Sequence, residues 1–191
     1  MLRRQFLSLW ALLCAPSINA ANQRKVTPAQ AEGPFYPVEP IPLRSDLVLQ
    51  ADGLVGESLW LQGRVLDREG KPVAGVRVEI WQCDGLGIYH HPGQPNHQRF
   101  DRHFAGFGAV ITAEDGRYSF HTISPVPYNT RPPHIHVKLW RAQRQLLTTQ
   151  LYLKGQTGSE WWAGRERQHL QIESLNINGR QTGEFNFVLA L

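Results

Sequence analysis

With 191 residues, 41% of them hydrophobic and 19% charged, the chain is long enough to bury the core of one domain, and this composition excludes an extended disordered protein. Six Trp, eight Phe and five Tyr, interrupted by 17 Gly and 13 Pro, favour a β-rich globular fold over a helical bundle. The formal net charge of +4 is too small to indicate binding to nucleic acid.

The first twenty residues have the pattern of an export signal. A basic start precedes an apolar run too short to span a bilayer, and the small residues Ala20 and Ala21 suit cleavage. Within this segment "RRQFL" (Arg3 to Leu7) resembles the twin-arginine signal, which carries folded proteins across bacterial membranes. We expect residues 1–20 to direct export to the periplasm, or secretion, and residues 21–191 to form a single domain. An ordinary secretory signal is the alternative.

Removal of this signal leaves a mature chain with a small charge and one cysteine. Loss of Arg3 and Arg4 lowers the formal charge from +4 to about +2, so we expect no nucleic-acid partner. We also expect no stable insertion into a membrane. Cys83 is then the only cysteine, which leaves no disulfide within the chain. The core must therefore be stabilised by packing.

The rest of the chain predicts an extended arm followed by strands. Residues 21–55 are rich in Pro, which fits neither a helix interior nor a central strand. Strand-like segments then follow at short intervals: "SLWLQGRVLD" (58–67), "VRVEIWQC" (76–83), "FGAVITA" (107–113), "RYSFHTI" (117–123), "HIHVKLW" (134–140), "LLTTQLYL" (146–153) and "EFNFVLAL" (184–191). Only "SEWWAGRERQHL" (159–170) suggests a short helix. We predict an all-β fold: a β-sandwich of mostly antiparallel strands with an extended Pro-rich N-terminal arm and few short helices.

The segment "YNTRPPHIHVKLW" (128–140) contains the first candidate for a metal site. Residues two apart on a strand point to the same face, so His134 and His136 present both imidazoles to one side. Two nitrogens can then meet one metal ion. A His-x-His pair alone is a weak signal, because a polar strand face is the more common explanation. Further ligands are needed to support a site.

Tyrosine is the available source of further ligands. The chain has no cysteine cluster, and no Asp or Glu lies between Tyr128 and His136. Tyr128 precedes the histidine pair, and Tyr89 ends a Gly-rich turn after a strand-like segment. Phenolate is a hard anionic donor, so two tyrosines and two histidines suit a ferric ion better than zinc. For either tyrosine alone, a buried residue with a hydrogen-bonded hydroxyl is the simpler interpretation.

Several blocks, in this order, resemble a known family. They are "TPAQAEGPFYP" (27–37), "GVRVEIWQCDGLGIYHH" (75–91), "FAGFGAVITAEDGRYSFHTISPVPY" (104–128), "RPPHIHVKLW" (131–140) and "TTQLYLKG" (148–155). Together they are similar to the intradiol ring-cleavage dioxygenases, the group that contains protocatechuate 3,4-dioxygenase and catechol 1,2-dioxygenase. The resemblance extends from about Thr27 to the C-terminus, and the "RPPHIH" block with its two upstream tyrosines is its most specific part.

The resemblance implies a catalytic domain, a site and a reaction. It makes Tyr89, Tyr128, His134 and His136 the ligands of Fe(III), with Tyr128 and His136 axial, and it makes Arg131 and Gln150 residues that face the substrate. The implied partners are a catechol-type substrate and O2, and the implied product is a cis,cis-muconate-type diacid. Tyr128 would also accept a proton from the substrate, and Arg131 would stabilise negative charge on the ring.

Two departures from the family leave the substrate open. Only Asn129 and Thr130 separate Tyr128 from Arg131, where the protocatechuate and catechol enzymes have a longer excursion. The long helical N-terminal segment of the catechol enzymes is also missing. The sequence leaves open whether the protein forms a homo-oligomer.

Two other interpretations remain. "GRVLDREGKPVAGVRVEIWQ" (63–82) also resembles transthyretin-like β-sandwich modules, many of which bind without catalysing a reaction, and this reading requires that Tyr89 and the histidine pair do not converge. A zinc hydrolase built on His134 and His136 lacks an obvious third ligand and a catalytic carboxylate. We expect the remaining histidines to serve as surface or packing residues: His90, His91, His97, His103, His121 and His169.

Overall fold

A computed structural model describes residues 23–158 and 164–191. Its strands are β1 (Ser58–Asp67), β2 (Arg77–Trp81), β3 (Phe107–Ile111), β4 (Arg117–Ile123), β5 (His134–Arg141), β6 (Arg144–Leu153), β7 (Gln171–Ile177), β8 (Arg180–Glu184) and β9 (Phe187–Leu189). Two short helices accompany them, the 3-10 helix η1 (His97–Arg99) and α1 (Gly164–Arg167). The expected export signal lies outside the described residues. No helix within those ranges is long and apolar enough to span a membrane.

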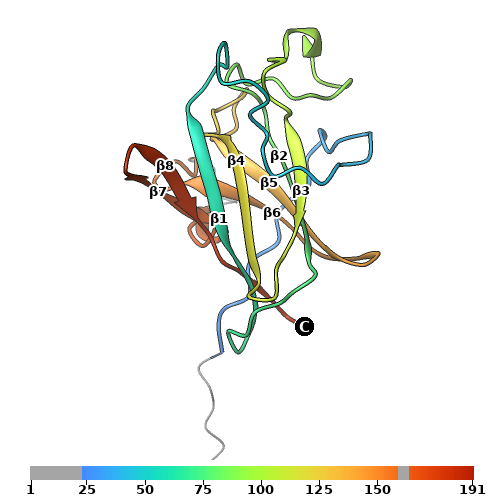
Figure 1. The fold of residues 1–191 in the computed structure, drawn as a ribbon, viewed down its shortest axis with the longest axis vertical. Coiled ribbons are helices and arrows are strands. Elements are labelled where there is room, and N and C mark those ends of the chain that lie inside the picture. The colour runs from blue at the N-terminus through green and yellow to red at the C-terminus, as the bar shows by residue number, and fades with distance from the viewer. Residues whose placement is uncertain (1–22, 159–163) are drawn as a thin grey trace, which may run out of the picture.

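The strands form two layers, and hydrogen bonding between neighbouring strands continues from one layer into the other. Strands β3, β2, β5 and β6 are neighbours in one layer, and β7, β8, β1 and β4 are neighbours in the other. The layers connect where β6 runs parallel to β7, and β9 extends the second layer beside β1. In Figure 1, β1 and β4 lie in front of β2 and β5. Five strand pairs are antiparallel and three are parallel, so the predicted sandwich of mostly antiparallel strands is confirmed.

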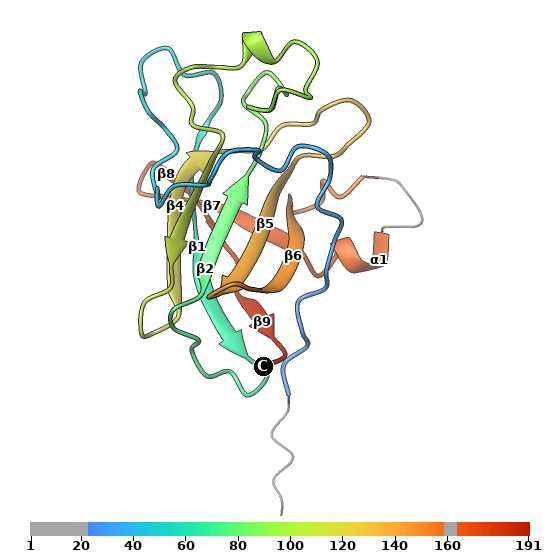
Figure 2. The same cartoon turned by 90° about the vertical axis from the view of Figure 1, so that its right-hand side faces the viewer.

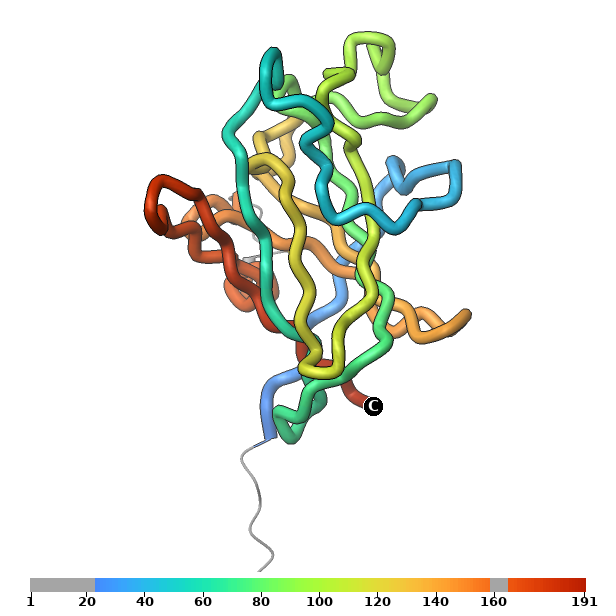
Figure 3. Tube along the Cα trace, viewed as in Figure 1, coloured from blue at the N-terminus to red at the C-terminus, as the bar shows by residue number. Residues whose placement is uncertain are grey.

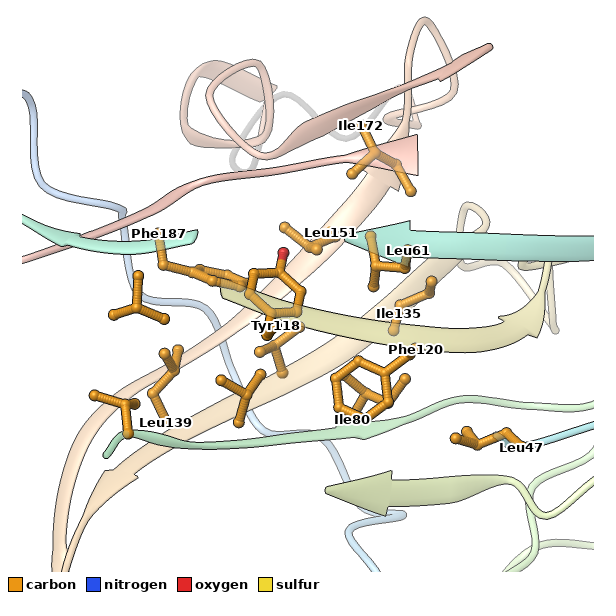
Figure 4. Packing of buried hydrophobic residues seen from close by; sticks show 14 of the residues in the cluster. Leu47, Leu61, Ile80, Tyr118, Phe120, Ile135, Leu139, Leu151, Ile172 and Phe187 are labelled. Carbon is orange, nitrogen blue, oxygen red and sulfur yellow. The ribbon is translucent and has the colours of Figure 1, made fainter. Parts of the chain in front are cut away.

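The core fills the space between the two layers. Alternate residues of each strand face inward, as the period of two requires, so that Leu61 of β1 and Phe120 of β4 meet Ile80 of β2 and Ile135 of β5 (Figure 4). All four are fully buried. Burial of one such side chain contributes about 1.5–3 kcal/mol. This contact between the layers is the main source of stability, since Cys83, the cysteine of the described residues, is free. The side chains on the outer faces of the strands are not part of this core.

The sequence missed one hairpin. Strands β7 and β8 are joined at Asn178 and Gly179, whose φ angles of 54° and 80° are those of the two-residue turn that Asn-Gly favours. The hairpin projects to one side of the sandwich in Figure 3. Because β7 and β8 are largely polar, their sequences lack the alternation of apolar and polar residues that identified the other strands. A short helix was expected over 159–170: residues 159–163 lie outside the described part, and among residues 164–170 the four residues of α1 are helical.

The N-terminal arm crosses the molecule without forming a regular strand, as its prolines predicted. Its start is fixed to the end of the chain, where the N–H of Thr27 donates to the carbonyl of Val188 at 3.0 Å. Farther along, isolated bridges tie Leu43 to Ala109 of β3. Figure 2 shows the arm in blue as it runs beside β6 and then crosses near the upper end of β5. The arm therefore covers the outer face of the first layer, the face on which the candidate site lies.

Candidate metal centre

Strand β5 presents two histidines on the face that points away from the core. His134 and His136 flank Ile135, which is fully buried between the layers, so both imidazoles project to the opposite face. The register fixes their neighbours, because His136 lies opposite Trp81 of β2 and opposite Gln150 of β6. Both histidines are nevertheless buried, since the arm covers this face.

Four side chains from three segments meet here. The Nε2 atoms of His134 and His136 are 3.1 Å apart, and the Oη of Tyr89 lies 3.1 Å from Nε2 of His136. The ring of Tyr128 completes the group, with its centroid 5.1 Å from that of Tyr89 and 5.5 Å from that of His134. Tyr89 comes from the turn after β2 and Tyr128 from the segment before β5. The structure thus brings together all four residues that the sequence predicted as ligands.

The hydrogen bonds of the imidazoles indicate which nitrogens face the cluster. Nδ1 of His134 lies 2.6 Å from the carbonyl oxygen of Pro132, so it carries the proton and donates to that oxygen. Its Nε2 therefore has a free lone pair on the side of Nε2 of His136. Within the described ranges, the buried Nδ1 of His136 has no hydrogen-bond partner. Both Nε2 atoms are the ones that could hold a metal.

Burial sets the protonation of these groups. It lowers the pKa of His134 to about 4 and the pKa of His136 well below 6.5, so both imidazoles are neutral at pH 7. Burial also raises the pKa of Tyr89 well above 10.0 and raises that of Tyr128. A phenol in this position ionises only if a cation replaces its proton. The cluster could therefore hold a cation through neutral nitrogens and phenol oxygens that ionise when the cation enters.

The donors fit a single metal ion. Two imidazole nitrogens that bind one metal at right angles, each at about 2.1 Å, lie about 3 Å apart. The two Nε2 atoms match this separation. Across the described ranges no group of three or more His, Cys, Asp and Glu side chains could hold a metal, so any ion bound here depends on the tyrosines. That set of hard oxygens and imidazoles favours ferric iron over zinc.

Arg131 is held beside the cluster by a tight turn. Its N–H donates to the carbonyl of Tyr128 at 2.8 Å, and Asn129 between them has a φ of 48°. This turn replaces the longer excursion expected from the family. The guanidinium is turned toward β6, where Nη2 donates to Oε1 of Gln150 at 2.8 Å. The two residues predicted to face a substrate are thus partners of each other.

Gln150 is itself fixed from two sides. Its Oε1 also accepts a hydrogen bond from the hydroxyl of Tyr152 at 2.7 Å, and its Nε2 donates to the carbonyl of Ala31 at 2.7 Å. Tyr152 was not among the residues predicted from the sequence. Its position two residues from Gln150 on the same face of β6 is the signal that could have found it.

Trp81 was also missed. Its ring is stacked on that of His136, with centroids 4.8 Å apart and planes inclined by 9°, and the ring of Tyr36 meets it edge-on at 5.0 Å. Trp81 is 1% exposed. The sequence could not indicate this contact, because it depends on β2 pairing with β5.

The arm supplies two further contacts to the cluster. The ring of Phe35 lies 4.9 Å from that of Tyr89 and 6.3 Å from that of Tyr128. Gly33 has a φ of 77°, and a Cβ at this position would lie 3.2 Å from Cε1 of His136. Only a residue without a side chain allows the arm to approach the imidazole this closely at this backbone angle.

The arm is anchored here by a buried cation. Lys138, two residues after His136 on the same face, is 4% exposed. Its Nζ forms an ion pair with Glu32 and lies 3.7 Å from the ring centroid of Tyr36, whose hydroxyl donates to Glu79 at 2.9 Å. The segment from Glu32 to Tyr36 is therefore tied to both β5 and β2.

Three of the six remaining histidines have side-chain partners away from the cluster. His103 lies against Asp101, His121 against Asp46, and the exposed His169 against Lys25. The ring of His91 is 5.6 Å from that of Phe35, at the edge of the cluster.

Comparison with known proteins identifies the family of this site. The family model described as "Dioxygenase" matches residues 31–160, which is more than half of the chain. The chain belongs to the intradiol ring-cleavage dioxygenase family. The resemblance seen in the sequence is confirmed, and a transthyretin-like module is disfavoured because Tyr89 and the histidine pair converge.

Relatives with assigned names belong to several branches of this dioxygenase family. The protocatechuate 3,4-dioxygenase beta chain of Burkholderia cepacia is 37% identical over 64% of this chain and 57% of its own length. The catechol 1,2-dioxygenase of Candida albicans is 29% identical over 70% of this chain and 49% of its own length. The chain thus spans about half the length of these curated relatives.

Solved structures include a much closer match in length. The dioxygenase domain of a dioxygenase and carbohydrate-binding protein fusion from Streptomyces sp. SirexAA-E is 33% identical, with a TM-score of 0.72 over 87% of this chain and 99% of that one. The intradiol ring-cleavage dioxygenase from Tetranychus urticae, at 21% identity and a TM-score of 0.70 over 87% of this chain and 95% of that chain, shares the fold.

Proposed function

We propose that this protein is a non-haem Fe(III) intradiol dioxygenase that inserts both atoms of O2 into a catechol-type aromatic and gives a cis,cis-muconate-type diacid. The observation that carries the proposal is the meeting of the His134, His136 and Tyr89 donor atoms, 3.1 Å from one to the next, in a member of the intradiol family. Its relatives are named for protocatechuate, catechol, hydroxyquinol and chlorocatechol, which all support an aromatic 1,2-diol as the substrate class.

In this proposal Tyr89, Tyr128, His134 and His136 hold the iron. The two neutral imidazoles and two phenolates would offset most of the charge of a ferric ion. Bound there, ferric iron would chelate both oxygens of a catechol dianion and make the ring reactive toward O2. The protein's part is to position the diol, take up its protons and exclude water from the buried face.

Tyr128 is the proposed proton acceptor. Its phenol has a pKa raised chiefly by burial, so its oxygen takes up a proton readily when no cation holds it. It is also the less buried of the two tyrosines, at 9% exposure against 2% for Tyr89. We assign the Oη of Tyr128 to accept a hydroxyl proton of the incoming catechol, while Tyr89 remains a ligand.

Arg131 is the proposed electrostatic catalyst. A fixed positive charge lowers the energy of a state in which negative charge develops on the ring, and it does so most effectively in a site from which water is excluded. Its hydrogen bond to Gln150, which Tyr152 shares, keeps the guanidinium from turning toward solvent. Gln150 therefore acts by holding Arg131 in place.

We further propose that the protein works after export, with residues 1–20 as the signal and the bacterial periplasm as its destination. The support is the "RRQFL" motif ahead of a modest apolar run. A protein that carries iron and closes its site with its own N-terminal arm suits a route that moves folded proteins.

The experiment is metal analysis and turnover of the mature chain from iron-replete cells. We expect about one ferric ion per chain, a burgundy colour from tyrosinate-to-iron charge transfer, oxygen uptake with a catechol, and both atoms of labelled O2 in the diacid. His136→Ala should lose iron and colour, while the exposed His169→Ala keeps both. Zinc in place of iron, or a yellow semialdehyde product from cleavage beside the diol, would refute the proposal.

A further inference from the structure

A cavity lies between the arm and the segment that follows Tyr89. It has a volume of about 720 Å³. One wall is the arm between Glu39 and Leu49, and the other is the segment that runs from His90 through η1 to Phe107. This segment lies at the end of the sandwich toward which β2 runs (Figure 2). A volume of several hundred Å³ is the usual size of a small-molecule site.

Stacked rings form the floor of the cavity. The imidazole of His90 lies between two phenyl rings, 5.0 Å from that of Phe100 and 5.7 Å from that of Phe107, with planes inclined by 15° in both cases. Gly106 permits this arrangement, because a Cβ there would lie 3.0 Å from Cζ of Phe100 and 3.2 Å from Cβ of His90. The result is a flat, partly exposed aromatic surface of the kind on which a planar ligand stacks.

The polar side chains of the cavity are free. They are Glu39, Arg44, His90, His97 and Arg102. In the part of the chain that the structure describes, none of these five forms an ion pair or a side-chain hydrogen bond. Two guanidiniums against one carboxylate make the cavity net positive, and guanidinium is the group that best pairs with a planar carboxylate.

We propose that this cavity is a binding site for an aromatic carboxylate. The ring of the ligand would stack on the partly exposed ring of Phe100, which is itself stacked on His90, and its carboxylate would pair with Arg44 and Arg102. Neither part would suffice alone, since a surface ion pair and a single stacked ring each contribute little to binding. The site does not depend on the proposed iron chemistry, because none of these residues belongs to the metal cluster.

The cavity is nevertheless in contact with that cluster. Phe107, on the cavity floor, packs in the same hydrophobic group as Tyr89 and Tyr128. His90 follows Tyr89 directly in the chain. An aromatic acid bound in the cavity would thus lie next to Phe107, which packs with Tyr89 and Tyr128, and next to His90, which follows Tyr89 in the chain.

The test is calorimetric titration of the mature protein with 2-naphthoate, which has no vicinal diol. We expect one saturable site with a Kd on the order of 0.1 mM, as the size of this ligand allows. Arg44→Gln and Arg102→Gln should each weaken binding about tenfold, whereas Arg99→Gln, an exposed arginine of η1, should leave it unchanged. The neutral 2-naphthalenemethanol should bind about tenfold more weakly than the acid.

Arg131→Gln distinguishes binding in this cavity from binding at the metal cluster. The proposal requires that this variant bind 2-naphthoate as the unmodified protein does. It would be overturned by loss of binding in Arg131→Gln with retention in both cavity variants, by equal affinity for the acid and the alcohol, or by no saturable binding below about 10 mM. Circular dichroism of each variant checks that the fold is intact.

Discussion

The indole ring of Trp81 lies parallel to the imidazole of His136, with 4.8 Å between the ring centroids. The two residues belong to neighbouring strands and are directly opposite in the register of β2 and β5. The imidazole therefore cannot rotate without displacing a fully buried indole. Orientation of this candidate ligand comes from stacking, since its Nδ1 has no hydrogen-bond partner among the described residues.

Replacement of Trp81 should therefore weaken the metal site as well as the fold. We expect Trp81→Leu to lower iron affinity about 10- to 100-fold, the range found when a group that orients a metal ligand is removed. The matched control is Trp60→Leu, because Trp60 stacks on His121 at 4.3 Å and 10° on the opposite layer. Iron titration of both variants checks this; equal losses of affinity would mean that stability alone is responsible.

Arg131→Gln should separate chemistry from metal binding. Guanidinium does not bind iron, so this variant should keep its iron and its colour. Turnover should fall about a hundredfold or more, the scale for loss of one preorganised charge-stabilising group. Arg141→Gln, at the exposed end of β5, serves as the control. Turnover of a good catechol at the unmodified rate would remove the electrostatic role and leave the iron assignment intact.

Gly33→Ala should disturb the site through one contact. The new methyl group would meet Cε1 of His136 at 3.2 Å and would also strain a backbone with φ of 77°. Gly155→Ala isolates the second effect, because Gly155 has the same φ of 77° and nothing within 4 Å of its Cβ position. Both variants should lose about 1–2 kcal/mol of stability from strain. A shift in the charge-transfer band of Gly33→Ala, absent in Gly155→Ala, is the expected signature of the contact.

Asp101 should make stability depend on acid pH. Burial alone would raise its pKa, but hydrogen bonds from the N–H groups of Val55 and His103 outweigh burial, so the pKa lies below its usual 3.8. The folded protein thus binds this proton less readily than the unfolded chain does, and the stabilisation is present above pH 3.8 and lost as the pH falls through the folded value.

Asp101→Asn should consequently be about 1–2 kcal/mol less stable at pH 7, and the difference should shrink below pH 3.8. Urea unfolding at several pH values measures this difference. Asp52→Asn, which changes an exposed carboxylate without a hydrogen bond in the described chain, should show no such trend. A difference that stays constant down to pH 2 would contradict the assignment.

Export offers a test that is independent of the site. Changing both Arg3 and Arg4 to Lys should leave the protein in the cytoplasm if the twin-arginine route carries it. Cell fractionation with an antibody against the mature chain gives the result. Unchanged delivery to the periplasm would assign the protein to the general secretory route.

The alternation of apolar and polar residues predicted most of the strands, because every second side chain of such a strand faces the core. In "HIHVKLW" the buried residues Ile135 and Val137 alternate with His134 and His136, and this period of two indicated both the strand and the face of the imidazoles. The polar alternation of β7 and β8 gave no such signal, although Asn178 at their turn is a strong hairpin marker.

Contacts between distant segments could not be predicted in this way. The candidate ligands emerged from a family resemblance together with residue chemistry, since both tyrosines lie outside the strand that carries the histidines. Trp81, Gly33 and Lys138 reach the cluster only through the pairing of β2 with β5 and through the path of the arm. No spacing along the chain encodes that path.

The attachment of the arm to β9 has a consequence for the order in which the domain assembles. The N–H of Thr27 donates to the carbonyl of Val188, and the N–H of Val188 donates to Oγ1 of Thr27 at 2.8 Å. Val188 follows Thr27 by 161 residues, so these two hydrogen bonds form only after β1 to β8 have been synthesised. The contacts of Pro28, Gln30, Ala31 and Glu32 with β5 and β6 can form earlier. Fixing of the arm at Thr27 is thus a late step of assembly, and a chain truncated before β9 should hold the arm over the cluster less firmly.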